Sequence, residues 1–120
     1  AMDRPGWHKA VGREHQAARE ACVLIDQTSF AKFALTGPDA AKALNWIASG
    51  PIDRPVGSLT YTQMLNARGG VECDLTVVRR AENDFYIVTG TGFAVHDFNW
   101  ISRSLRGDVH LADITSGHAV

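Results

Sequence analysis

Alternating residues on either side of a glycine-containing turn constrain this chain more than any other feature. Residues 71–78 place apolar side chains at every second position, which is typical of a strand that buries one face. Residues 59–65 form another strand-like segment, and the NARGG sequence at 66–70 between them supplies residues that accept the positive φ angles of tight turns. The pattern predicts a β-hairpin. A polar turn at 81–84 then leads to a third predicted strand at 85–89.

Helical and strand patterns account for most of the remaining chain. Apolar residues three and four positions apart predict two helices, and alternation predicts two further strands. The predicted helices are residues 8–25 and 91–105, and the predicted strands are residues 29–36 and 109–114.

A third helix is predicted at residues 36–48, ahead of a Ser-Gly-Pro stop. We expect Thr36 to cap the free backbone N–H groups of this helix. Pro38 suits an early helical position, and Asp39 favours the positive end of the helix dipole.

Two prolines and two glycines within residues 50–57 predict a connector between two parts of the chain. Residues 1–57 then hold a helix, a strand and a helix, and residues 58–120 form a subdomain of hairpin, strand, helix and strand. We expect an α+β domain with an antiparallel sheet and helices on one face.

The composition excludes several classes of function. The chain has 12 basic and 13 acidic residues, a net charge of −1, and neither half is strongly basic, which argues against nucleic-acid binding. No apolar run approaches the roughly 20 residues that span a bilayer. Ala1 directly before Met2 is typical of an added residue, so we expect the native segment to begin at Met2 or later.

Cysteine and histidine patterns predict neither a disulfide nor a metal site. Cys22 and Cys73 are expected to be half-buried thiols in a reducing compartment. The five histidines form no HxH or HExxH motif. We expect His96 and Asp97 at the solvated edge of the helix predicted at 91–105.

Asp74 is the residue whose position admits a functional interpretation. Alternation places Cys73 and Leu75 on one face of the strand and Asp74 on the other. One interpretation is a carboxylate on the solvated side of the sheet. The other is a carboxylate at the floor of a cleft that holds a cationic or N–H-bearing ligand. Tyr61 or Met64 beside it would make such a cleft apolar.

Four segments resemble a known family. The sequences LIDQTSFAKF at 24–33, TGPDA at 36–40, YTQMLN at 61–66 and GGVECDLTV at 69–77 resemble the aminomethyltransferase (glycine cleavage T-protein) folate-binding fold. The resemblance covers nearly the whole chain. It implies the N-terminal portion of that fold, truncated, with tetrahydrofolate as cofactor.

Within this family, RPGW at 4–7, VGREH at 11–15 and VTGTG at 88–92 are more similar to the C-terminal folate domain of flavin-dependent dimethylglycine and sarcosine dehydrogenases. T-proteins usually have an asparagine in place of Gly90. In those dehydrogenases an FAD-containing domain oxidises an N-methyl amine, and the folate domain receives the one-carbon unit. The resemblance implies a bacterial cytoplasmic or mitochondrial matrix protein. We expect the fragment to be inactive alone and to self-associate through surfaces that the absent parts would cover.

The resemblance also assigns site residues. It implies that Asp74 lies near the reactive nitrogens of the folate, where it accepts a proton or stabilises positive charge. It further implies that Tyr61, Met64 and Asn66 line the pterin or benzoyl end of the site. Two alternatives stay open: an aminomethyltransferase that works with a lipoyl carrier, and a non-catalytic folate-binding scaffold module.

Overall fold

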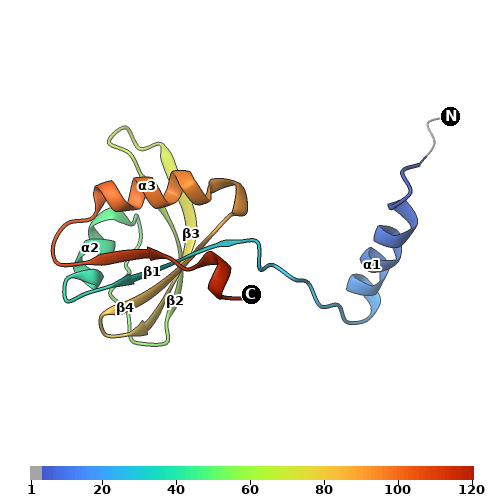
Figure 1. The fold of residues 1–120 in the computed structure, drawn as a ribbon, viewed down its shortest axis with the longest axis horizontal. Helices are drawn as coiled ribbons and strands as arrows, with labels where there is room; N and C mark the ends of the chain where they lie inside the picture. Colours follow the sequence, from blue (N-terminus) through green and yellow to red (C-terminus); the bar gives the residue numbers. More distant parts are fainter. Residues whose placement is uncertain (1–3) are drawn as a thin grey trace.

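The computed structural model describes residues 4–120, so the expectation for Ala1 and Met2 lies outside the described residues. Its centre is one five-stranded antiparallel sheet with the strand order β2-β3-β4-β1-β5 (Figure 1). The predicted α+β class with an antiparallel sheet is confirmed. The strands are β1 (Ala31–Thr36), β2 (Leu59–Leu65), β3 (Val71–Ala81), β4 (Asp84–Thr89) and β5 (His110–Asp113).

The predicted hairpin is formed by β2 and β3. Gly69 has a φ of 81°, a conformation that glycine adopts without strain. The Asn66 side chain closes the turn, because its Oδ1 accepts hydrogen bonds from the backbone N–H groups of Arg68 (2.9 Å) and Gly70 (3.0 Å). The resulting register places Gln63 opposite Asp74.

Strand β1 lies between β4 and β5, so the sheet takes strands from both residues 1–57 and residues 58–120. The connector at 50–57 is fastened to β3 by Arg79. Its guanidinium donates to Asp53 Oδ1 (2.8 Å) and to the Arg54 carbonyl oxygen (2.7 Å).

Helices α2 (Ala40–Ile47) and α3 (Ala94–Ser104) cover the same face of the sheet (Figure 1). Their apolar stripes meet the buried side chains of the strands because each stripe recurs at helical spacing. The core cluster includes Phe33, Leu44, Leu75, Phe85, Ile87 and Ile101.

The predicted start of α2 is wrong. Thr36 is the last residue of β1 and pairs with Asp84 and His110, so it cannot cap a helix that begins at Ala40. Asp39 takes the position before the helix, and its Oδ2 accepts a hydrogen bond from the Asp108 backbone N–H at 2.8 Å.

Helix α1 (His8–Glu20) is shorter than the predicted 8–25 and has no buried residue among those described. It lies away from the sheet at the end of an extended segment (Figure 1). Residues 21–25 leave the helix, and Leu24 is fully exposed. The predicted helix at 91–105 begins instead with a 3₁₀ turn, η1 (Thr91–Phe93). None of the helices in residues 4–120 is long and apolar enough to cross a membrane.

Replacing Gly37 should destabilise the fold strongly, because two effects add. Its φ is 130°, and a Cβ there would lie 2.4 Å from the Asp108 carbonyl oxygen. Gly57 has a φ of 90° with nothing within 4 Å of its Cβ position, so it is a matched control that tests backbone strain alone. We expect Gly37→Ala to lower the free energy of unfolding by about 3 kcal/mol or more and Gly57→Ala by about 1–2 kcal/mol. Denaturant unfolding measures both, and equal losses would contradict the close approach at Gly37.

Candidate functional site at the end of strand β4

A cleft of about 540 Å³ opens where β4 ends and the chain turns into η1. Leu75 and Thr89 form the pair nearest this end of the β3–β4 ladder. The residues of β3 that precede Leu75, among them Asp74 and Glu72, extend beyond this pair. Among the described strands, this part of β3 pairs only with β2. The cleft occupies the space that β4 leaves, and its walls are largely apolar. They include Phe30, Val71, Leu75, Val88 and Phe93.

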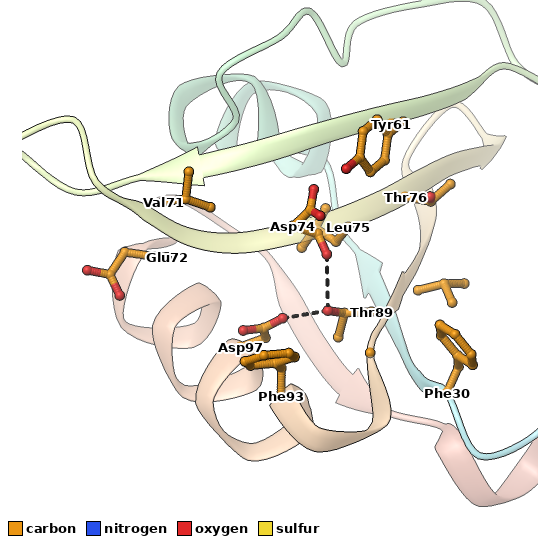
Figure 2. Close-up of a pocket in the computed structure, with 12 residues that line it drawn as sticks. Phe30, Tyr61, Val71, Glu72, Asp74, Leu75, Thr76, Thr89, Phe93 and Asp97 are labelled. Atoms are coloured by element: carbon orange, nitrogen blue, oxygen red, sulfur yellow. Dashed lines mark hydrogen bonds between the residues drawn. The ribbon is translucent and has the colours of Figure 1, made fainter.

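Asp74 lies at this cleft as an exposed carboxylate, with Tyr61 near it (Figure 2). The Gln63 side-chain amide donates to Asp74 Oδ1 at 2.8 Å. The hydroxyl of Tyr61 and then the amide of Gln63 lower the pKa of Asp74, and slight burial opposes them. The same carboxylate raises the pKa of Tyr61. Asp74 is therefore held ionised near neutral pH, and it both lines a cleft and faces solvent.

A buried carboxylate, Asp97, lies at the back of the cleft. Its Oδ2 accepts a hydrogen bond from Thr89 Oγ1 at 2.5 Å, and the same hydroxyl lies 3.4 Å from the Asp74 carbonyl oxygen (Figure 2). Asp97 is only 1% exposed, so the predicted solvated position is wrong for this residue. The reason is helical spacing, which places residue 97 between residues 94 and 101 on the inward face of α3.

His96 connects Asp97 to strand β3. Its Nδ1 lies 2.9 Å from Asp97 Oδ1, and its Nε2 lies 3.4 Å from Glu72 Oε2. The Asn66 side-chain amide donates to Glu72 Oε1 at 2.9 Å. The hydrogen bond with Asp97 is the largest of the causes that raise the pKa of His96. His96 itself is about half exposed, so its predicted position at a solvated edge is confirmed.

The structure brings together two of the four predicted site residues. Tyr61 and Asp74 both line the cleft, whereas Asn66 stabilises the hairpin turn and reaches the cleft only through Glu72. Met64 is fully buried in the core on the opposite face. Positions 61 and 64 differ by three, and strand alternation therefore sends their side chains to opposite faces.

Cys73 is buried and Cys22 exposed, so the expectation that both thiols are half-buried is wrong. Burial, followed by the negative charge of Asp97, raises the pKa of Cys73 to about 12, which keeps this thiol protonated. Potential ligand atoms of Cys73, His96 and Asp97 lie within 4.8 Å of one another. Hydrogen bonds already engage Asp97, and the absence of a metal site stays a prediction.

Sequence reasoning missed Thr89, Asp97 and Glu72 as components of the site. Each is an ordinary polar residue in its own segment, and the pairing of β3 with β4 together with the packing of α3 against β3 brings the three together. The one available signal was the position of Asp97 within the inward stripe of its helix.

Comparison with known proteins gives concordant matches. The chain matches the family described as GCVT N-terminal domain over residues 2–120. It is 38% identical over 118 residues to mitochondrial sarcosine dehydrogenase of Mus musculus, covering 88% of this chain and 13% of that protein. It is 33% identical over 115 residues to mitochondrial dimethylglycine dehydrogenase of Rattus norvegicus, covering 93% of this chain and 13% of that protein.

A solved structure supports the same relationship. The crystal structure of glycine cleavage system aminomethyltransferase T from Bartonella henselae superposes with a TM-score of 0.71 and 25% sequence identity. The match covers 75% of this chain and 26% of that one. The chain thus spans only a small part of the length of the relatives it matches.

The Thr89 hydroxyl should contribute measurably to stability, since it donates to a buried carboxylate. We expect Thr89→Val to lower the free energy of unfolding by about 1–3 kcal/mol, because Asp97 then loses a buried donor. Thr76→Val makes the same chemical change at a half-buried position lining the same cleft. We expect it to change the free energy of unfolding by no more than about 0.5 kcal/mol. Thermal or denaturant unfolding distinguishes them, and indistinguishable variants would contradict the importance of this hydrogen bond.

Proposed function

Because this chain belongs to the GCVT N-terminal domain family, we propose that its cleft is the tetrahydrofolate-binding part of a flavin-dependent N-methyl amine dehydrogenase. The two dehydrogenases reported above support this assignment through their names, which specify sarcosine and dimethylglycine. The FAD-containing domain that would oxidise the amine belongs to the remainder of the full-length protein. Two relatives are named as mitochondrial and the matched structure comes from a bacterium. We propose a mitochondrial matrix or bacterial cytoplasmic location.

The observation that carries the proposal is the Asp74 carboxylate at a largely apolar cleft, where the Gln63 amide donates to its Oδ1 at 2.8 Å and Tyr61 lines the same cleft. A cavity of about 540 Å³ is within the usual range for a small-molecule site. The apolar walls suit an aromatic ring, and a carboxylate suits the N–H groups that such a ring carries. These residues fit a folate.

Asp74 would act on the nitrogens of the bound folate, which supplies the site that accepts the one-carbon unit. The Gln63 amide donates one hydrogen bond to Asp74 Oδ1, and the carboxylate has further lone pairs that can accept a hydrogen bond from a ligand N–H group. The negative charge also favours positive charge as it develops on the one-carbon unit. A positioned acid–base group of this kind contributes roughly 10²–10⁴-fold in rate.

An aminomethyltransferase of the glycine cleavage system is the second candidate function. The fold similarity to the Bartonella henselae enzyme favours it. In that case a lipoyl carrier would present the one-carbon unit, and the full-length protein would carry no flavin domain. A non-catalytic folate-binding scaffold is the remaining alternative, in which Asp74 would be dispensable for cellular function.

Calorimetric titration with tetrahydrofolate tests the cleft directly. We expect this chain to bind tetrahydrofolate and Asp74→Asn to bind roughly tenfold to a hundredfold more weakly, because a charge-assisted hydrogen bond is lost. Asp108→Asn makes the same change at an exposed position outside the cleft, and its affinity should equal that of the parent chain. Equal affinity of Asp74→Asn and its parent would contradict the role of Asp74. Absence of binding in all three proteins would contradict the folate site itself.

We also propose that the chain self-associates through strand β2, which is at an edge of the sheet. Its outward side chains Leu59, Tyr61 and Leu65 are exposed on the same face as Asp74. Residues 48–50 bond to this edge at residues 62–64, and the exposed apolar start of β2, at Leu59 and Tyr61, favours pairing with another chain. Sedimentation velocity should show association that increases with concentration, and Leu59→Lys should shift the equilibrium towards monomer. A monomer at every concentration would contradict the proposal.

A further inference from the structure

We propose that His96 is a positioning residue of the cleft, whose imidazolium form ties β3 to α3 and fixes the backbone that carries Asp74. The inference deepens the proposed function and rests on it for the identity of the ligand. It begins from a structural problem at Asp74. This residue lies beyond the Leu75–Thr89 pair, so the edge of β3 that faces the cleft has no strand beside it among the described residues.

A ring of side-chain contacts lies at this edge, where strand pairing is missing. From β3, Glu72 Oε2 lies 3.4 Å from His96 Nε2, and His96 Nδ1 lies 2.9 Å from Asp97 Oδ1. Asp97 Oδ2 accepts the Thr89 hydroxyl, whose oxygen lies 3.4 Å from the Asp74 carbonyl oxygen. Because the Thr89 hydroxyl donates its one proton to Asp97, its 3.4 Å approach to the Asp74 carbonyl oxygen closes the ring by contact and not by a second hydrogen bond. The ring starts and ends on β3, two residues apart.

The protonation state of His96 decides whether this ring is complete. A neutral imidazole is uncharged and has one N–H group, whereas the imidazolium attracts both carboxylates, donating to Asp97 Oδ1 and forming an ion pair with Glu72 Oε2 at 3.4 Å. The charged and titratable groups facing His96 are Glu72 from β3 and Asp97 from α3, with the protonated Cys73 thiol beside Asp97. The Asn66 amide, in the hairpin turn, donates to Glu72. The positive charge of Arg103 slightly opposes the rise in the pKa of Cys73. Both carboxylates favour the imidazolium.

The direction of the pH dependence follows. The pKa of His96 is raised above its ordinary 6.5, so the ring is complete below pH 6.5 and opens as the pH rises through the raised value. Half of the imidazole surface is exposed, which lets it exchange protons with water while its two nitrogens face the carboxylates. Opening the ring releases the tie between α3 and Glu72, two residues from Asp74 on β3, and a misplacement of about 1 Å in such a group costs up to about a hundredfold in rate.

Nuclear magnetic resonance of the ligand-free chain tests the ring without reference to folate. We expect the backbone amide signals of Asp74 and Leu75 to titrate with the same midpoint as the His96 imidazole, above pH 6.5. In His96→Lys, which keeps the positive charge, these signals should not titrate between pH 6 and 8. In His96→Gln they should lie near the high-pH position of the parent chain at every pH. His110→Gln, at an exposed histidine of β5, is the matched control and should titrate like the parent.

Tetrahydrofolate binding then supplies a separate functional measurement. We expect the affinity of the parent chain to fall about tenfold as the pH rises through the His96 midpoint, and the affinity of His96→Lys to stay constant over that range. An Asp74 amide that does not follow His96, or that titrates equally in His96→Lys, would overturn the positioning role. A chain that shows the coupled titration but binds no tetrahydrofolate would refute the proposed function and leave the ring in place.

Discussion

The cleft depends on one break in the sheet, the parting of β4 from β3 beyond the Leu75–Thr89 pair. Backbone groups along an unpaired edge must find other partners, because burying them unsatisfied costs free energy. At this edge the Thr89 hydroxyl lies 3.4 Å from the Asp74 carbonyl oxygen but donates its one proton to Asp97. Separately, the Gln63 amide on β2 holds the Asp74 side chain. The same break therefore opens a cavity and presents a carboxylate to it from an ordered strand.

Asp97 and Asp74, two of the three carboxylates that line the cleft, have different environments. Asp97 is buried and is compensated by Thr89 and His96, as a buried charge requires. Asp74 is exposed, and its donors leave part of its accepting capacity unused. This difference separates a structural anion that stabilises the end of β4 from an anion available to a ligand.

Most of the fold could be predicted because it follows from patterns between residues that are close in the sequence. Alternation in residues 71–78 and the NARGG turn were sufficient to predict the hairpin, and the resemblance led to Asp74. Long-range pairing was not predictable. The buried Lys32 is an example. Its Nζ donates to the Thr28 carbonyl oxygen at 2.6 Å, and its backbone N–H donates to the hydroxyl of Thr115, 83 residues away. The inward position of Asp97 follows from helical spacing, but its hydrogen bond with Thr89 requires β4 to end beside α3. The predicted role of Met64 could have been excluded by counting positions along the strand.

The contrast between the two thiols has a practical consequence. Cys73 is sealed within the core and protonated at any pH at which the protein would be handled, whereas Cys22 lies exposed just after α1. Maleimide reagents react with accessible thiolates, so a dye added to the unaltered chain would attach at Cys22 alone. The extended arm thus carries its own attachment point, from which fluorescence could report where α1 goes when the rest of a longer polypeptide is present.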